Sequence, residues 1–151
     1  DWAFLPVGYL IDDGMENPAV KAIDRAYASL SAGRMLRFRL RANPTRKIDT
    51  KSGPQGEKRN GRRVPLLAPA AQLEWLARKG QTHGFELLEA TVAAAGASEL
   101  VHSHSTGRTF QGVVFEGRLV VRDAERFREA LEQGIGPGKA YGYGLLSVGP
   151  G

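Results

Sequence analysis

Cysteine is absent from the 151 residues of this chain. Its absence excludes a disulfide framework, a thiolate zinc site and a cysteine nucleophile. Long apolar runs are absent as well, since none approaches the roughly 20 residues that a membrane-spanning helix needs. A chain without cysteine fits a cytoplasmic protein, and we expect no membrane among its partners.

The first residues do not have the pattern of a secretory leader. Residues 1–6 carry no basic stretch followed by an apolar one, so we do not expect them to be a signal peptide. They lack an initiator Met and begin within an apolar stretch. We therefore expect that an N-terminal part is absent from this chain, and that residues 1–33 are the tail of a preceding domain plus a linker. A helix opening at Asn17-Pro18 and closing at Gly33 is one interpretation of this segment.

What is present indicates a folded chain with an uneven distribution of charge. Apolar residues make up 42% of the chain and charged residues 25%, as in globular proteins. The net charge is +5, but residues 34–63 hold eleven Lys/Arg and two acids, a local +9 that leaves −4 for the remainder. This block favours a polyanion partner such as RNA or DNA. A solvated basic loop is the alternative.

Residues 35–41 alternate strictly between apolar residues and arginines. A period of two predicts a strand with one apolar face and one arginine face, formed by Arg37, Arg39 and Arg41. Like charges side by side repel one another unless water or an anion screens them, so we favour an anion-facing strand. An edge strand that resists aggregation is the alternative. Residues 42–63, rich in Gly and Pro, predict a basic loop that orders on a phosphate backbone.

The rest of the chain predicts further helices and strands in a regular order. Pro69 suits the first turn of a helix that ends at Gly80 or Gly84, with Leu76 and Ala77 inside and Gln72 outside. A strand over 85–91 and a hairpin over 99–121 follow, with a bulge or second turn at Glu116-Gly117.

Asp123 is an N-cap candidate for the last helix, which Gly134 closes. Leu145–Val148 is the last strand. From residue 35 on, the order is strand, helix, strand, strand, helix, strand, which predicts an α+β, ferredoxin-like (RRM-like) domain over residues 34–151. RNA-recognition modules share this topology, but fold alone does not decide function.

A glycine-rich segment between the last helix and the last strand is the most specific motif. It contains Gly134, Gly136, Gly138, Gly142 and Gly144, with Lys139 in the middle. Glycines allow close approach of the backbone to a ligand, and free N–H groups beside Lys139 suit a phosphate. The spacing, the absence of a hydroxyl after Lys139 and the following strand exclude a P-loop. A tight helix-to-strand crossing is the alternative.

This glycine-rich segment resembles the C-terminal signature of CRISPR repeat-associated RNA-binding proteins. Residues 36–44 resemble the first strand of the second domain in CasE-type proteins. The stretches 61–64, 75–79, 83–85 and 115–119 follow in the same order as in that family, and residues 1–2 and 8–9 resemble the late part of its first domain. The resemblance covers nearly the whole chain and is poorest at residues 12–33, where it implies an extended connection and not a helix.

The resemblance implies two ferredoxin-like domains, so that residues 1–33 include the end of the first. CasE-type proteins bind the stem-loop of CRISPR repeat transcripts and cut at its 3′ base without metal, by attack of a ribose 2′-OH on the adjacent phosphate. They remain on the product within Cascade, the antiviral complex. A histidine and a tyrosine on the first helix of the family's first domain support the proton transfers. No position here matches them, so we expect no catalytic residue, metal or cofactor in this chain.

The remaining histidines and tryptophans allow simpler interpretations. His102 and His104 are two residues apart on one strand of the predicted hairpin, so their side chains point to the same face. Such a pair can bind a metal ion, but no third ligand is evident in the sequence. The alternative is that both are exposed polar residues without a ligand. The resemblance places this hairpin in the RNA groove. His83 is expected to be structural or a helix cap, and Trp2 and Trp75 to be core residues.

The expected partners are CRISPR repeat stem-loop RNA and the other Cascade subunits. The expected RNA-binding residues are mostly phosphate contacts: Arg37, Arg39, Arg41, Arg62, Arg63, Arg78, Lys79, His102, His104, Arg108 and Lys139. Two alternatives remain: a non-catalytic RNA-binding subunit of a CRISPR complex, and a protein–protein module whose basic block serves solubility.

Overall fold

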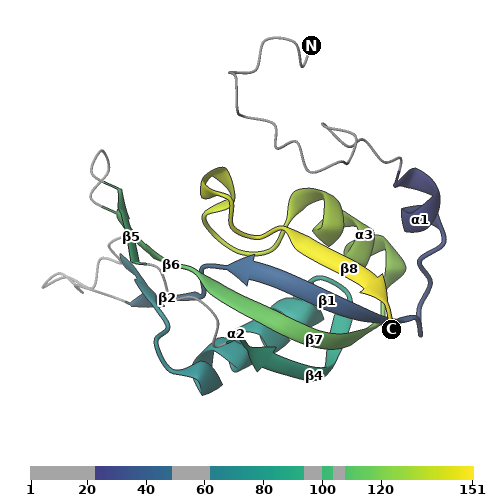
Figure 1. Ribbon diagram of the computed structural model, residues 1–151, viewed down its shortest axis with the longest axis horizontal. Coiled ribbons are helices and arrows are strands. Elements are labelled where there is room, and N and C mark those ends of the chain that lie inside the picture. Colours follow the sequence, from purple (N-terminus) through teal and green to yellow (C-terminus); the bar gives the residue numbers. More distant parts are fainter. Residues whose placement is uncertain (1–22, 49–61, 94–99, 104–107) are drawn as a thin grey trace, which may run out of the picture.

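The computed structural model describes residues 23–48, 62–93, 100–103 and 108–151 (Figure 1). Its centre is an antiparallel sheet of four strands, in the order β4-β7-β1-β8. The strands are β1 (Met35–Ala42), β4 (Phe85–Val92), β7 (Val113–Val121) and β8 (Leu146–Pro150). Helices α2 (Pro69–Thr82) and α3 (Ala124–Gln133) pack against one face of the sheet. The predicted ferredoxin-like order is confirmed.

Strand β1 shows the alternation that the sequence predicts. Its burial pattern is strictly exposed-then-buried, which places the three arginines on the face away from the helices. Strands β7 and β8 both pair with β1. The edge-strand interpretation is therefore wrong, because β1 lies inside the sheet.

Aromatic side chains fill the layer between sheet and helices. Trp75 of α2 stacks on Phe115 of β7, with ring centroids 6.2 Å apart, so the prediction of Trp75 as a core residue is confirmed. Phe85 of β4 meets Phe127 of α3 edge-on at 5.8 Å. Each helix is thus fixed to a different strand by a ring pair, and such pairs contribute about 0.5–1.5 kcal/mol beyond their buried area.

The two helices begin as predicted, but two residues of α2 face other sides of the helix than the sequence predicts. Asp123 caps α3, since its Oδ1 accepts from the N–H groups of Glu125 and Arg126, both at 3.1 Å. In α2, Gln72 is buried and donates from Nε2 to the Leu66 carbonyl at 2.8 Å, whereas Ala77 is exposed. The predicted buried and exposed positions are wrong for these two residues. Gln72 is buried because its side chain hydrogen-bonds to the carbonyl of Leu66, in the segment that leads into the helix.

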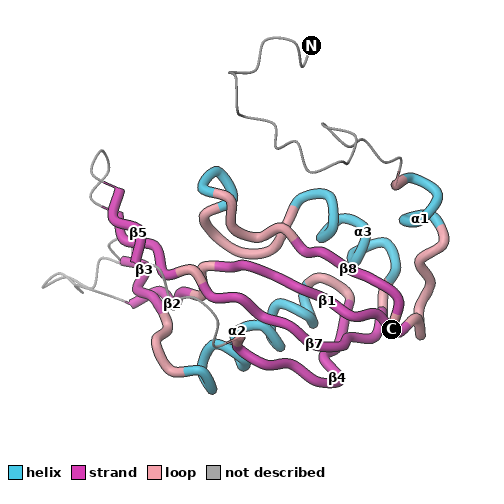
Figure 2. Tube along the Cα trace, in the orientation of Figure 1, coloured by secondary structure: helices cyan, strands magenta, loops and turns pink. Residues whose placement is uncertain are grey.

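Two short hairpins extend from one end of the sheet (Figure 2). Strands β2 (Thr45–Ile48) and β3 (Arg62–Pro65) form the first, and β5 (Leu100–Ser103) and β6 (Arg108–Gln111) form the second. The interpretation of residues 42–63 as a loop is wrong at both ends, since β2 and β3 pair there. Pro44 separates β2 from β1, and Gly112 separates β6 from β7.

Strand β7 runs without interruption through Glu116 and Gly117, so the predicted second turn is wrong. The irregularity lies in the neighbouring strand β4, where the register shifts between Leu87 and Glu89. A Cβ on Gly117 would collide with the Glu89 carbonyl. Glycine is needed there because the bulged β4 backbone approaches β7 closely.

Among residues 23–34, which precede the sheet, the structure has a short helix, α1 (Asp24–Ala28), so the predicted helix does not reach Gly33. Arg128 of α3 fixes this segment by donating to the carbonyls of Tyr27 at 3.0 Å and Leu30 at 3.2 Å. The domain boundary between residues 33 and 34 stays a prediction, since residues 1–22 lie outside the described ones. No helix in the described ranges is long and apolar enough to cross a membrane.

Candidate nucleic-acid interface

Three segments that are far apart in the sequence meet where β1 ends and β7 begins (Figure 1). The Gly144 N–H donates to the Arg41 carbonyl at 2.7 Å, which fixes the glycine-rich segment to β1. The Asn43 side chain, which is buried, accepts from the Gln111 N–H at 3.2 Å and ties the two hairpins together. The basic hairpin β2–β3, the hairpin β5–β6 and the glycine-rich segment therefore share one end of the sheet.

The hairpin β2–β3 presents cations that lie opposite one another. Lys47 and Arg63 are directly paired across the two strands, and both side chains are exposed. Like charges in this position destabilise a strand pair unless an anion lies between them. Arg46 on β2 is also exposed, and the backbone of Arg62 lies on β3 opposite Ile48. Arg46 and Lys47 belong to the basic block but are not among the predicted contacts, because the sequence pattern there predicts a loop and not a strand.

The glycine-rich segment is built on left-handed backbone. Gly138 and Gly142 have φ of 90° and 78° and flank a single 3-10 turn, η2 (Lys139–Tyr141). Gly144 must be glycine, because a Cβ there would lie 2.7 Å from the Ile135 carbonyl. The Ile135 N–H in turn donates to the Gly144 carbonyl at 2.8 Å. The segment is thus a closed, tight helix-to-strand crossing that holds Lys139 exposed at its tip.

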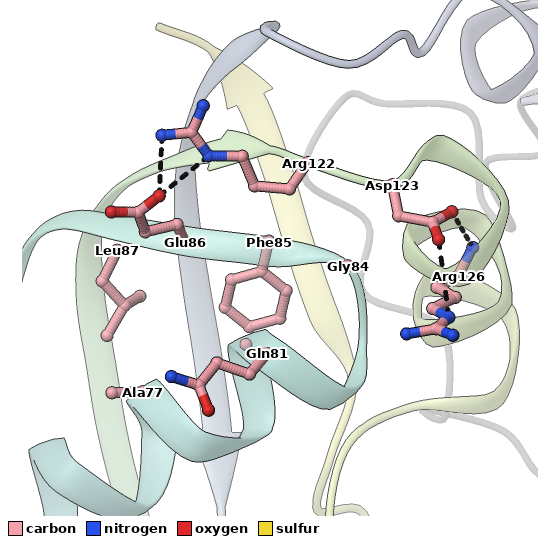
Figure 3. Close-up of a pocket in the computed structure, with 10 residues that line it drawn as sticks. Ala77, Gln81, Gly84, Phe85, Glu86, Leu87, Arg122, Asp123 and Arg126 are labelled. Carbon is pink, nitrogen blue, oxygen red and sulfur yellow. Dashed lines mark hydrogen bonds and ion pairs between the residues drawn. The ribbon is translucent and has the colours of Figure 1, made fainter.

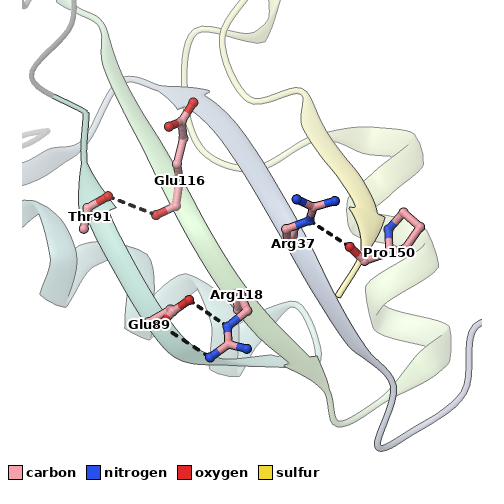
Figure 4. A network of polar contacts seen from close by, with 6 residues as sticks. All are labelled: Arg37, Glu89, Thr91, Glu116, Arg118 and Pro150. Carbon is pink, nitrogen blue, oxygen red and sulfur yellow. Dashed lines mark hydrogen bonds and ion pairs between the residues drawn. The ribbon is translucent and has the colours of Figure 1, made fainter.

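The arginines of β1 point away from the helices, but intramolecular partners already screen them. The guanidinium of Arg39 lies 3.2 Å from the Glu116 carboxylate, its direct partner on β7. Arg37 donates from Nε to the Pro150 carbonyl at 2.9 Å (Figure 4). Arg41 lies over the Tyr143 ring, 5.3 Å from its centroid. An anion is therefore not required to keep these three side chains together.

The same face of the sheet carries a second row of ion pairs. Arg118 of β7 donates to Glu89 of β4 at 2.7 Å (Figure 4), and Arg122 lies 2.7 Å from Glu86. None of these partners was predicted, because cross-strand register cannot be read from a local pattern. Three arginines on this face are therefore each paired with a glutamate of a neighbouring strand, although Arg37 and Arg118 are themselves cross-strand partners.

A smaller group of basic residues, His83 and Lys79 at the end of α2 and Lys139 in the glycine-rich segment, interacts through its charges. His83 is the C-cap residue of α2, as expected, and its N–H donates to the Lys79 carbonyl at 2.9 Å. Burial lowers the pKa of His83, and the charges of Lys79 and Lys139 lower it further, against an opposing effect of Glu129. Lys79 also lies 5.9 Å from the Trp75 ring centroid, while Arg78 lies 4.0 Å from Glu74.

For the second hairpin, the structure shows the strand pairing of His102 and Arg108. His102 lies on β5 opposite Thr109, and Arg108 lies on β6 opposite Ser103. His104 lies outside the described residues. Within the described ranges, no group of three or more His, Asp or Glu side chains is placed to hold a metal ion.

A hollow of about 450 Å³ lies between the end of α2, the start of β4 and the start of α3 (Figure 3). Its carboxylates are engaged: Glu86 with Arg122, and Asp123 with the helix N-terminus and with Arg126 at 3.4 Å. Both carboxylates thus have an arginine partner at the hollow itself. The sheet end, not this hollow, is the candidate site.

A family model described as CRISPR associated protein matches residues 1–150. The chain belongs to this family. A CasE-type member is indicated by the "CRISPR-associated endoribonuclease Cse3" of Thermus thermophilus, 35% identical over 161 residues that cover 99% of this chain and 68% of that protein. The "CRISPR system Cascade subunit CasE" of Escherichia coli is 36% identical over 123 residues, covering 80% of this chain and 61% of that protein.

A solved structure of Thermus thermophilus Cse3, bound to an RNA representing a pre-cleavage complex, is similar to this CasE-type chain with a TM-score of 0.65 and 39% identity. The similarity covers 81% of this chain and 56% of that one. The CasE-type chain thus spans about two thirds of the length of the curated relatives it matches, and less of the solved chain.

Proposed function

We propose that this chain binds the stem-loop of CRISPR repeat RNA and forms the RNA-holding part of an endoribonuclease that processes precursor CRISPR RNA within Cascade. The main observation behind the proposal is that three separate segments meet at one end of the sheet. Two of them, the basic hairpin β2–β3 and the glycine-rich segment, have distinctive sequences. Membership in the family, and relatives named as an endoribonuclease and a Cascade subunit, support it.

The RNA contacts follow from the charge of the sheet end. Arg46, Lys47 and Arg63 project from the β2–β3 hairpin, and Lys139 projects from the glycine-rich segment. An A-form stem has a deep, narrow major groove, so a protein recognises it mainly by shape and by its phosphates. These four cations are the strongest phosphate contacts of the proposal. Arg37 and Arg39 are weaker ones, because each already has an intramolecular partner.

The proposed reaction needs no metal. The ribose 2′-oxygen attacks the adjacent phosphorus, the bond to the 5′-oxygen breaks, and a proton passes to that leaving oxygen, so that a cyclic phosphate remains. A general base and a general acid support the two proton transfers. We propose that both come from outside residues 1–151. The chain itself holds the RNA backbone in position, and cations beside the reacting phosphate favour the charge that develops there.

The test is a gel assay with the 151-residue chain and a labelled CRISPR repeat hairpin in EDTA, at about 50 and 200 mM salt. We expect binding without cutting, and an affinity that falls steeply with salt, since each phosphate contact contributes a slope of roughly 0.7–0.9 in a log–log plot. Affinity that does not depend on salt would contradict the charge-based contacts. Metal-free cutting would place the catalytic residues inside this chain, with His102 and His104 as the first variants to make.

Two further proposals depend on this one. Docking onto other Cascade subunits is supported by the relative that is named as a Cascade subunit. A cytoplasmic location is supported by the absence of cysteine together with an RNA substrate. Failure of the chain to bind any structured RNA would favour the alternative of a protein–protein module.

A further inference from the structure

One aromatic side chain at the sheet end is exposed although its neighbours are buried. Tyr141 is 47% exposed, whereas Phe110 and Tyr143 are 7% and 5% exposed. The rings of Phe110 and Tyr141 lie 4.4 Å apart between centroids, and those of Phe110 and Tyr143 lie 6.0 Å apart. Phe110 therefore supports the Tyr141 ring from below, while much of that ring remains open to solvent.

The backbone holds the Tyr141 ring in a defined place. The N–H of Tyr141 donates to the Gly138 carbonyl at 2.8 Å, and that of Gly142 donates to the Lys139 carbonyl at 3.1 Å. A Cβ on Gly138 would lie 3.0 Å from the Tyr143 ring, so glycine allows the turn to approach the aromatic group. A Cβ on Gly142, the residue that follows Tyr141, would meet nothing within 4 Å apart from its chain neighbours, so the backbone next to Tyr141 is not covered by another part of the described chain.

Cations border this ring. Lys139 belongs to the same turn and is exposed, and the Arg41 guanidinium lies over the neighbouring ring of Tyr143 at 5.3 Å. A solvent-exposed ring with cations beside it is the combination that binds single-stranded nucleic acid, because the base stacks on the ring while the cations hold the phosphate. A base inside a stem is already stacked between its neighbours and does not need such a ring.

We propose that the Tyr141 ring is a stacking platform for an unpaired nucleobase that flanks the bound RNA stem. This inference rests on the proposed function and adds a contact that does not depend on charge. The stacked base would hold the strand leaving the stem against the glycine-rich segment. Lys139 would then meet the phosphate of the same nucleotide.

The competing interpretation is that Tyr141 only covers Phe110 and stabilises the fold. Three variants separate the two roles. Tyr141→Phe keeps the aromatic face, and Tyr141→Leu keeps apolar cover over Phe110 without an aromatic face. Leu145→Ala is the matched control, because Leu145 is an exposed apolar residue, 70% exposed, at the end of the same segment.

The experiment uses the full 151-residue chain and a repeat hairpin with 2-aminopurine at each flanking unpaired position in turn. We expect fluorescence quenching at one position with the wild type and with Tyr141→Phe, and its loss with Tyr141→Leu. The Kd of the Tyr141→Leu variant should rise by about 5- to 150-fold, equivalent to about 1–3 kcal/mol per stacked base. Its salt slope should stay that of the wild type, since no phosphate contact is removed.

The outcomes distinguish the two proposals. A wild-type chain that fails to bind the hairpin would overturn the proposed function and this inference together. Normal binding by the wild type, with Tyr141→Leu unchanged in Kd and no quenching at any flanking position, would overturn the stacking platform alone. An equal loss of affinity in Tyr141→Leu and Leu145→Ala would also overturn it, because apolar cover would then account for the effect.

Discussion

Lys47 and Arg63 lie directly opposite each other on β2 and β3, with both side chains exposed. In the part of the chain that the structure describes, neither forms an ion pair with a carboxylate. Among the described residues of the hairpin, a repulsion thus remains that an opposite charge would relieve. A phosphate backbone supplies that charge in the proposed complex.

Replacing Arg63 by Glu should change folding stability and RNA binding in opposite directions. The free energy of unfolding should rise by about 0.2–1 kcal/mol, because Lys47 gains a cross-strand partner of opposite charge. RNA affinity should fall, with the salt slope reduced by about one. Urea unfolding and binding titrations at several salt concentrations measure the two effects.

Arg34→Glu is the matched control for this variant. Arg34 is exposed and lies just before β1, at the far end from the hairpins, where its carbonyl accepts from the Val121 N–H at 2.9 Å. Its charge change is the same, so an equal loss of RNA affinity in both variants would show that net charge matters and not the hairpin.

Arg39→Ala should weaken RNA binding less than Arg63→Ala does. Arg39 is engaged with Glu116 at 3.2 Å, whereas Arg63 has no such partner among the described residues. The pair is largely exposed, so its loss should change the free energy of unfolding by only about 0–1 kcal/mol. Binding titrations measure the comparison, and equal losses in the two variants would show that Glu116 does not withhold Arg39 from the RNA.

Lys139→Gln should raise the pKa of His83. Burial is the main cause of the lowered pKa, and the charges of Lys79 and Lys139 add to it. Because the native pKa lies below the ordinary value of 6.5, the contribution of His83 to stability is complete above that pH and is lost as pH falls from there through the native pKa. NMR titration of the imidazole signals measures the shift, and an unchanged or lower pKa would contradict it.

The same histidine gives a pH dependence of stability. The free energy of unfolding should decrease as pH falls below about 6.5, since the unfolded chain then binds a proton more readily than the native one. His83→Gln should make this decrease smaller. Urea unfolding at pH 7.5 and at pH 5.5 would show the difference, and an identical decrease in the variant would exclude His83 as its source.

Gly117→Ala should destabilise the sheet by about 1–3 kcal/mol, because the new methyl group would overlap the bulged backbone of β4 at Glu89. Gly149→Ala on β8 is the matched control, since a Cβ there meets nothing within 4 Å. Its effect should remain within about 0.5 kcal/mol. Similar urea midpoints for the two variants would contradict the close approach of β4 and β7.

Some features of this protein could be predicted because each depends on nearby residues. The alternation at residues 35–41 predicts β1, and Pro69 and Asp123 mark where the two long helices begin. The order of these elements was sufficient for the ferredoxin-like topology. The basic block was visible as well, because charge needs only to be counted.

The tertiary structure decided the properties that depend on partners far along the chain. Glu116 screens Arg39 only because β1 and β7 pair in this register. The bulge lies in β4 at Leu88, next to the place where Gly117 lets the β4 backbone approach β7 closely. The gathering of two hairpins and the glycine-rich segment at one sheet end has the same origin. Sequence by itself determined the order of the main strands and helices and where the positive charge lies. Packing across the sheet decided which cations are already paired and which remain exposed for an anion, because register is set by contacts between distant strands.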